Sequence, residues 1–286
     1  MDRDEEREAA VRRGQLDRVQ DERARERQEE LESRTAYMRL RLGDRYAARG
    51  KVKQAITQYK QAVNMDGGTP LFRTRLADAY VLAGLISLAM AQYRKVLKSH
   101  PNYADAWASV GDVYRRFGMG AMALQTYRKA AQLSPDRAYY RYKLSETYAE
   151  LGLIREGIGE LRKAAELAPG EAFYRFRLAE LYDREGLHAL ALPEFALAAR
   201  LAPFDDYYQV RLATALMAAG AIGDAIAAYN KALEIRPDSR CYRTLLADAQ
   251  CKAEGRQFDE SEQGRERDLD DYDRAFIRRR RSEYGA

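Results

Sequence analysis

The sequence is poor in the residues from which disulfides, metal sites and catalytic bases are usually built. Its 286 residues include only two histidines and two cysteines. Cys241 and Cys251 lie ten residues apart on one predicted helix, too far apart there for a disulfide or a shared metal ion. His100 and His188 form no zinc-binding pair, and no phosphate-binding glycine loop occurs. We therefore expect no cofactor, no metal site and no enzymatic activity.

Long apolar runs are also missing. No stretch is long and apolar enough to span a bilayer, and the first residues, MDRDEEREAAVRRG, contain no apolar core of the kind found in secretory signals. Unpaired cysteines are typical of a reducing compartment. These observations predict a cytoplasmic location, with a position peripheral to a larger complex or a membrane left open.

Charge is abundant but unevenly distributed. The net charge of +5 combines −3 over residues 1–34, +9 over 35–255 and −1 over 256–286. Residues 256–286 contain a run of eight acids and two arginines over Asp259–Asp273, followed by Arg278–Arg281. The central part of the chain is therefore basic, and its two ends are not.

What the sequence has in abundance is a 34-residue period. The six frames are 36–69, 70–103, 104–137, 138–171, 172–205 and 206–239. The eleventh place is tyrosine in five frames, the twentieth is small, and the twenty-fourth is large. The fifteenth place is always glycine: Gly50, Gly84, Gly118, Gly152, Gly186 and Gly220. Self-similarity at such a period indicates stacked supersecondary units.

Each frame reads as two helices joined by a turn. In the third frame, Trp107, Val110 and Tyr114 recur at helical spacing, and Gly118 stands where the chain must leave the first helix with a positive φ. Proline at the thirty-second place ends the second helix in five frames. Two amphipathic helices cannot bury both faces alone, so each pair is expected to stack on the next.

These residues resemble the tetratricopeptide repeat family over 36–239. The resemblance implies an all-α fold, a right-handed α-solenoid of six helix pairs with a concave groove, used as a protein-binding scaffold. Residues 1–35 form a charged extension, 240–255 a capping helix, and 256–286 an acidic and then basic tail.

One departure stands out. The family carries an aromatic residue at the fourth place, which in this chain is present only as Trp107. Four other frames carry arginine at that place, and most of these four carry an aromatic ring one residue earlier. We interpret the shifted ring as retained core volume.

By the same resemblance, the first helix of each pair lines the groove. In frames four to six this predicts aromatic anchors beside carboxylates. The predicted groove residues are Tyr139, Tyr142, Glu146, Phe173, Phe176, Glu180 and Tyr207. Family members that clamp a terminal carboxylate need lysine and asparagine at these places, so that mode is disfavoured here. We expect the protein to be a scaffold or adaptor that binds an apolar or basic peptide of a partner protein in this groove. This expectation includes a role as a subunit or assembly factor of a larger complex. The alternative is that each acid pairs with the base three residues before it, as in Arg177–Glu180.

A second function stays open, that of an electrostatic adaptor for nucleic acid or an anionic membrane surface. The second helices carry a basic ladder: Lys60, Arg94, Lys95, Arg128, Lys129, Arg162, Lys163 and Lys231. Arg278, Arg279, Arg280 and Arg281 add a possible polyanion contact. Basic residues late in a helix also suit its dipole, so a structural role for the ladder is the competing interpretation. The arginine run is equally a candidate internal ligand of the carboxylate row.

Overall fold

The structure is a computed structural model, and it describes residues 34–255. Every regular element within that range is a helix. The all-α solenoid of helix pairs predicted from the 34-residue period is therefore confirmed.

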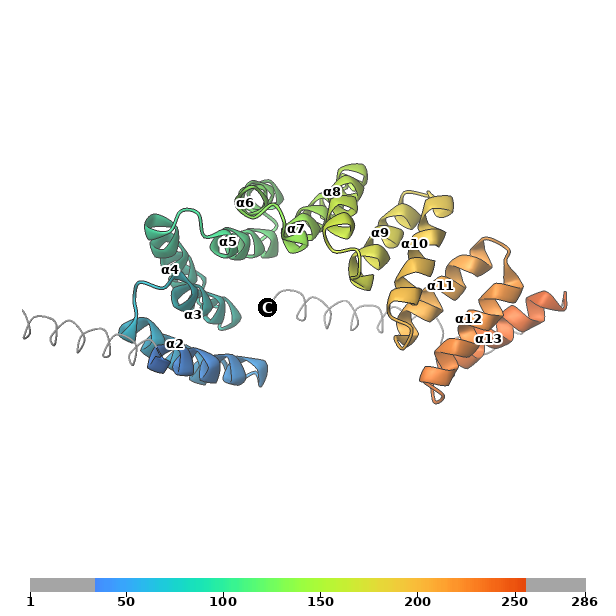
Figure 1. Ribbon diagram of the computed structural model, residues 1–286, viewed down its shortest axis with the longest axis horizontal. Coiled ribbons are helices and arrows are strands. Elements are labelled where there is room, and N and C mark those ends of the chain that lie inside the picture. Colours follow the sequence, from blue (N-terminus) through green and yellow to red (C-terminus); the bar gives the residue numbers. More distant parts are fainter. Residues whose placement is uncertain (1–33, 256–286) are drawn as a thin grey trace, which may run out of the picture. The chain divides into compact units, whose positions relative to one another are not determined.

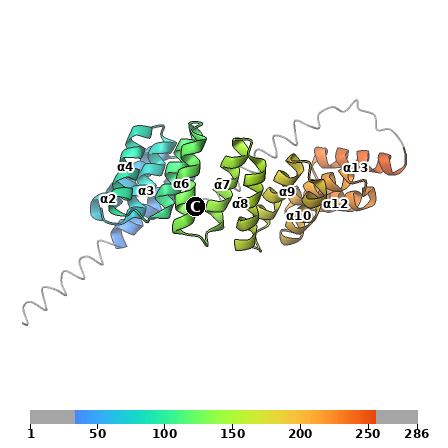
Figure 2. The same cartoon turned by 90° about the horizontal axis from the view of Figure 1, so that it is seen from above.

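The chain divides into two compact units. Unit 1 ends at Val113 and unit 2 begins at Tyr114, so the boundary falls inside α5 (Ala104–Arg116). The other helices described in unit 1 are the one over residues 34–48, α2 (Val52–Met65), α3 (Pro70–Leu82) and α4 (Ile86–Ser99). Those of unit 2 are α6 (Gly120–Leu133), α7 (Ala138–Glu150), α8 (Ile154–Leu167), α9 (Ala172–Arg184), α10 (His188–Leu201), α11 (Asp206–Ala218), α12 (Ile222–Ile235) and α13 (Arg240–Ala253). Within each unit the helix pairs follow one another in chain order (Figures 1 and 2).

The glycine at the fifteenth place makes each tight turn possible. Gly84 has a φ of +75°, and the amide of the following Leu85 donates a 2.8 Å hydrogen bond to the carbonyl of Tyr80. That bond satisfies a carbonyl at the end of the first helix, and the positive φ would strain any residue with a Cβ. The same conformation recurs at Gly50, Gly118, Gly152, Gly186, Gly220 and Gly255. The predicted positive φ is thus confirmed in all six frames and repeated after α13.

In five of the six frames, proline at the thirty-second place follows the second helix at a fixed distance, as Pro101 follows the end of α4 at Ser99. Pro193 lies inside α10. A proline at this place removes one backbone hydrogen bond of the helix, so the sequence predicts a shifted helix start or a kink. The helix start is not shifted, because His188 begins α10 at the same place of the frame as Ile154 begins α8.

Arginine at the fourth place ties the two helices of a pair together. Arg141 of α7 reaches Glu160 of α8 at 2.9 Å, and Arg175 of α9 reaches Glu194 of α10 at 3.3 Å. Lys163 also binds Glu160, and the two cations hold the pKa of that carboxyl below its usual value although burial opposes them. The rings at the third place of four frames are buried, as predicted: Phe72, Tyr140, Tyr174 and Tyr208. The arginine is therefore a cross-link that takes the place of the family's aromatic.

The helix α13 ends the described part of unit 2 and packs on α12. Tyr242 and Ala249 of α13 are buried with Tyr229 and Ala232 of α12 in one apolar cluster. The side chain of Ser239 accepts a hydrogen bond from the amide of Tyr242 and caps the helix start. α13 thus covers an apolar face of the last complete pair.

Candidate interaction face on the first helices of unit 2

The first helices of unit 2 bring the predicted aromatic anchors together, but not as exposed rings. Tyr142 is 1% exposed, and Phe173, Phe176 and Tyr207 are 0% exposed. Tyr139 alone is half-buried. Four of the five predicted anchors are therefore buried, and their role in a binding groove remains a prediction. Tyr37, at the place equivalent to Phe173 in unit 1, is 45% exposed, so burial here depends on the neighbouring residues and not on the place alone.

The buried rings contact one another from helix to helix. The ring centroids of Tyr142 on α7 and Phe173 on α9 lie 5.0 Å apart, edge to face. Those of Phe176 on α9 and Tyr207 on α11 lie 5.3 Å apart in the same arrangement. Aromatic pairs in this geometry stabilise packing beyond their buried area. These four rings, the aromatic row, therefore belong to the apolar core of unit 2.

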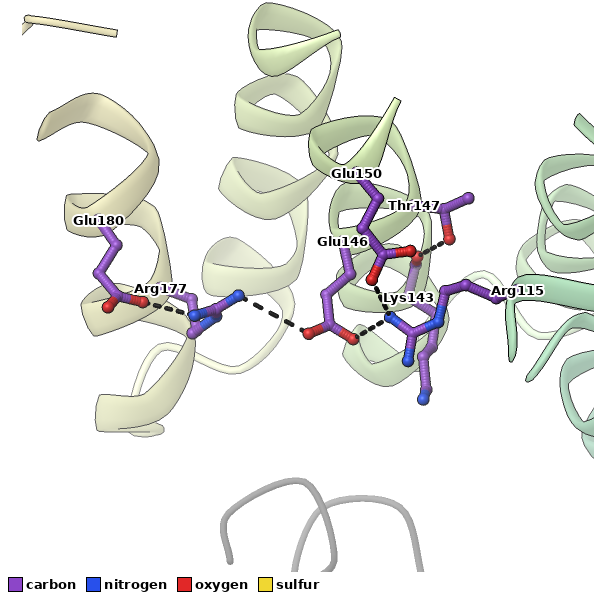
Figure 3. Close-up of polar contacts among 7 residues, drawn as sticks. All are labelled: Arg115, Lys143, Glu146, Thr147, Glu150, Arg177 and Glu180. Atoms are coloured by element: carbon purple, nitrogen blue, oxygen red, sulfur yellow. Dashed lines mark hydrogen bonds and ion pairs between the residues drawn. The ribbon is translucent and has the colours of Figure 1, made fainter. Parts of the chain in front are cut away.

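The carboxylates on the same face form an ion-pair chain with arginines of neighbouring repeats. Glu146 lies 2.8 Å from Arg115 and 3.7 Å from Arg177. Arg177 also binds Glu180 at 2.6 Å, and Glu180 lies 3.9 Å from Arg211. Figure 3 shows the side chains of Arg115 on α5, Glu146 on α7, and Arg177 and Glu180 on α9 pointing toward one another. We name Arg115, Glu146, Arg177, Glu180 and Arg211 the Arg–Glu chain.

Burial makes this chain more than a set of surface ion pairs. The Glu146 side chain is 2% exposed and that of Arg177 16%. Burial on its own lowers the pKa of Arg177, but the carboxylates of Glu180 and Glu146 outweigh it and hold that pKa above its usual value. Removing one member would leave a buried charge without compensation. The predicted i,i+3 pair Arg177–Glu180 is present, and the longer links between repeats were not predicted.

Unit 1 satisfies the equivalent carboxylates in a different way. The hydroxyl of Tyr59 donates to Asp44 at 2.7 Å, and that of Tyr93 donates to Asp78 at 2.5 Å. Each pair joins the ninth place of the first helix to the twenty-fourth place of the second helix in the same repeat. A tyrosine of the same repeat is thus a donor to each of these acids, and Ser109 of the next repeat adds a hydrogen bond to Asp78.

In unit 2 the tyrosine donor is replaced in two repeats. Leu161 and Phe195 occupy the twenty-fourth place, and the ninth place changes from aspartate to Glu146 and Glu180. Without a hydroxyl in reach, the longer glutamates bind arginines across the repeat boundary. This paired change is visible in the sequence, and it is the signal that could have located the Arg–Glu chain.

The charges of this face are unequal. Both oxygens of Glu146 and both oxygens of Glu180 face arginines, so the Arg–Glu chain contains three arginines and two glutamates. Lys143, which is buried with its ammonium 5.2 Å from the ring centroid of Tyr139, adds a further cation. Glu150, 3.2 Å from Arg115, adds a further carboxylate. The face therefore carries four cations against three carboxylates, and both carboxylates predicted from sequence are paired with arginines.

Several residues of the basic ladder are engaged within the fold. Arg128 donates to the Tyr148 hydroxyl at 2.6 Å, Lys163 binds Glu160, and Lys60 lies 5.9 Å from the ring centroid of Tyr80. These contacts support the structural interpretation of the ladder. Arg278–Arg281 lie outside the described residues. Among residues 34–255, no cluster of histidine, cysteine and acids could hold a metal ion.

A separate surface pocket of about 690 Å³ lies among α10, α11 and α12. Its floor includes Ala196 and Gln209, where the preceding repeat has the longer Arg162 and Arg175. Gln209 donates to the carbonyl of Ala199 at 3.3 Å, and Phe204 at the rim is 88% exposed. The pocket therefore exists because two arginines of the repeat pattern are absent here, a feature that sequence reasoning missed.

Replacing Phe176 by alanine should unfold unit 2 more easily, because the ring is fully buried between α9, α10 and α11. We expect a loss of about 3–5 kcal/mol in the free energy of unfolding, measured by urea denaturation. Phe204→Ala is the matched control and should change it by less than about 0.5 kcal/mol, because this ring is exposed. Equal effects of the two substitutions would contradict the burial described here.

Asp78 should make the stability of unit 1 depend on pH. Burial raises the pKa of Asp78 from 3.8 to about 6, although the hydrogen bond from Tyr93 opposes the shift. The folded protein then holds this proton more tightly than the unfolded chain, so the free energy of unfolding falls as pH rises from about 4 to about 6 and is level above. The fall amounts to at most about 3 kcal/mol. Asp78→Asn should abolish that part of the pH profile, and an unchanged profile would show that Asp78 does not titrate in this range.

The comparisons agree with this architecture. Tetratricopeptide repeat models match residues 40–96, 74–138 and 207–239. No curated protein matches the sequence. Among solved structures, pilF of Pseudomonas aeruginosa is 19% identical with a TM-score of 0.60, over 76% of this chain and 99% of that one. TTC0263, a tetratricopeptide repeat protein of Thermus thermophilus, is 26% identical with a TM-score of 0.53, over 64% of this chain and 99% of that one.

A third similar structure is the APC/C hetero-tetramer Cut9–Hcn1, at 16% identity and a TM-score of 0.56. The match covers 75% of this chain but only 43% of that chain. None of the helices described over residues 34–255 has the length and apolar character needed to cross a membrane. The recurring glycine turns, the helix pairs and the family matches lead to one conclusion: the chain belongs to the tetratricopeptide repeat family, and its fold is that of a protein-interaction scaffold.

Proposed function

We propose that unit 2 binds a peptide segment of a partner protein along its first-helix face, the surface formed by Tyr139, Lys143, Arg177 and Arg211 around the Arg–Glu chain. The observation that supports the proposal is the surplus of positive charge on this face. Both carboxylates of the Arg–Glu chain are bound by arginines, and with Lys143 and Glu150 the face carries four cations against three carboxylates.

The preferred segment then differs from the one predicted from sequence. A basic peptide would have to displace arginines from Glu146 or Glu180. A segment that supplies acceptors, either backbone carbonyls or aspartate and glutamate side chains, can bind the arginines without breaking the existing pairs. Tyr139, which is half-buried and packs against the apolar cluster that contains the aromatic row, gives such a segment an aromatic contact. We therefore infer an acidic segment with aromatic or apolar side chains.

The scaffold role needs no catalytic group, and we expect no enzymatic activity. The electrostatic alternative, binding of nucleic acid or an anionic membrane surface, has support only from the net charge of the central part of the chain. Such binding would weaken steeply with salt and would persist without the first-helix face. It is an outcome that the following experiment can detect.

Selection from a random peptide display library on the full chain tests the chemistry of the face directly. We expect enriched peptides to combine aromatic residues with aspartate or glutamate. The variant Lys143→Gln/Arg211→Gln should bind them at least about 10-fold more weakly, since a charge-assisted hydrogen bond contributes about 1.5–3 kcal/mol.

The matched control is Lys129→Gln/Arg155→Gln, which removes the same charge from exposed positions outside the face. It should bind the selected peptides as the wild type does. Enrichment of lysine- and arginine-rich peptides would contradict the inferred chemistry. Equal weakening by both variants, with steep salt dependence, would favour the electrostatic alternative.

A further inference from the structure

At the surface pocket among α10, α11 and α12, three side chains depart from the repeat pattern together. We propose that this pocket is a second binding site of unit 2, and that it takes a large apolar side chain of a partner protein together with a carboxylate next to that side chain. The residues that line the pocket differ from those that define the first-helix face. The two sites can therefore be tested independently of each other.

Two of the departures leave space where other repeats carry a long side chain. Ala196 stands at the twenty-fifth place, which holds lysine or arginine in the first four frames: Lys60, Arg94, Arg128 and Arg162. Gln209 stands at the fourth place, where Arg175 of the preceding repeat reaches Glu194 of α10. Gln209 donates instead to the carbonyl of Ala199 at 3.3 Å. The space left open measures about 690 Å³, within the range of about 300–1,000 Å³ that is usual for ligand pockets.

The third departure adds an aromatic ring at the rim of the pocket. Phe204 stands at the thirty-third place, in the turn between α10 and α11, where the other frames have residues that favour turns: Gly68, Asn102, Asp136, Gly170 and Asp238. Its ring is almost wholly exposed, so it adds little to the core of unit 2. A single exposed ring needs no explanation on most surfaces, but this ring borders an apolar pocket, where aromatic residues are typical binding anchors.

The chemistry of the lining defines the ligand. The apolar lining side chains include those of Ala196, Ala199, Pro203, Leu212 and Ile235. Arg200, Lys231 and Glu234 also line the pocket, and all three are exposed. Over residues 34–255, none of these three charged side chains has a partner in an ion pair. Two cations against one carboxylate favour a negatively charged ligand, and the apolar lining favours a large uncharged side chain beside that charge.

A segment of a partner protein is the source that agrees with the fold, which is that of a protein-interaction scaffold. A second copy of the chain that inserted its own Phe204 reciprocally would bring the Arg200 and Lys231 side chains of both copies together, and like charges disfavour such a contact. Residues 256–286 of the same chain also contain acids and aromatic rings. The experiment must therefore separate an outside segment from this one.

The variant Ala196→Glu closes the pocket with a side chain of a length that the repeat accommodates, because four other frames carry lysine or arginine at this place. The glutamate stands four residues before Arg200, a spacing that favours an ion pair on a helix. The substitution therefore removes apolar space and engages one of the two cations. The matched control is Asn230→Glu, which adds the same charge at the same place of the next repeat, in an exposed position outside the pocket lining.

Selection with a random peptide library displayed on phage identifies ligands of the pocket. Peptides are selected on the full wild-type chain, and those that also bind Ala196→Glu are removed. We expect the remaining peptides to combine phenylalanine, tryptophan or leucine with an adjacent aspartate or glutamate. They should bind Asn230→Glu as they bind the wild type.

Labelled synthetic copies of these peptides then locate the contact by fluorescence anisotropy. Arg200→Gln/Lys231→Gln should bind them about 3–10-fold more weakly than the wild type, because each exposed ion pair contributes little. Phe204→Ala should bind them at least about 5-fold more weakly, as expected for an aromatic anchor. Lys143→Gln/Arg211→Gln should bind them as the wild type does.

Other results overturn the proposal. If Ala196→Glu retains every peptide that the wild type binds, the pocket is not a binding site. If the remaining peptides lack acids, or bind Arg200→Gln/Lys231→Gln as tightly as the wild type, the ligand does not have the proposed chemistry. Neither result affects the proposed function, because that function depends on the peptides that Lys143→Gln/Arg211→Gln weakens.

A photo-crosslinker at the rim distinguishes the occupants directly. With p-benzoylphenylalanine in place of Phe204 in the full chain, illumination should join residue 204 to a selected peptide, as identified by mass spectrometry. Ala196→Glu in the same chain should abolish that product. Crosslinks of residue 204 to residues 256–286 of the same molecule, or to a second copy, that a selected peptide does not displace would overturn the proposal.

Discussion

A buried carboxylate needs a hydrogen-bond donor, and the source of that donor organises this protein. Every complete repeat places a polar side chain at the ninth position of its first helix, close to the stacked helices. In unit 1 the donor to Asp44 and Asp78 is a tyrosine of the same repeat. In unit 2 the donors to Glu146 and Glu180 include arginines of neighbouring repeats. The residue at the twenty-fourth place therefore decides whether the carboxylate has a tyrosine of its own repeat as a donor or depends on arginines of neighbouring repeats.

The linked arrangement has consequences for both stability and binding. An alternating chain of arginines and glutamates couples α7, α9 and α11, in addition to the apolar stacking that all solenoid repeats share. It also pairs both glutamates of the chain with arginines. The function proposed above follows from this pairing, because a basic ligand would have to displace an arginine whereas an acidic ligand would not.

The repeat architecture followed from sequence because its signals are local and repeated. The glycine of each turn, the proline after each second helix and the helical spacing of apolar residues each act within one repeat. The arginine at the fourth place, Arg141 for example, could be recognised as a departure, but its partner Glu160 was not predicted. No feature of the sequence led us to predict that the chain divides into two units inside α5.

The candidate site was predicted only in part, because burial is a property of several repeats together. A helical wheel places Phe173 and Tyr37 at the same position, yet one is fully buried and the other is 45% exposed. The charge of the face was misread for a similar reason. The sequence shows Glu146 and Glu180, but their partners Arg115 and Arg211 lie on other helices. The sequence indicates the change of hydrogen-bond donor only through two joint replacements. Tyrosine is replaced by Leu161 or Phe195, and aspartate is replaced by glutamate in the same repeats.

The central claim is that the donor at the twenty-fourth place decides where the carboxylate binds. A double-mutant cycle at repeat four tests it, with Glu146→Asp and Leu161→Tyr recreating the aspartate–tyrosine pair of unit 1. Each single change should destabilise the protein in urea denaturation, and the double variant should recover a coupling energy of about 1–3 kcal/mol. Additive effects of the two changes, with no recovery, would show that the tyrosine and arginine donors are not interchangeable and would contradict the account.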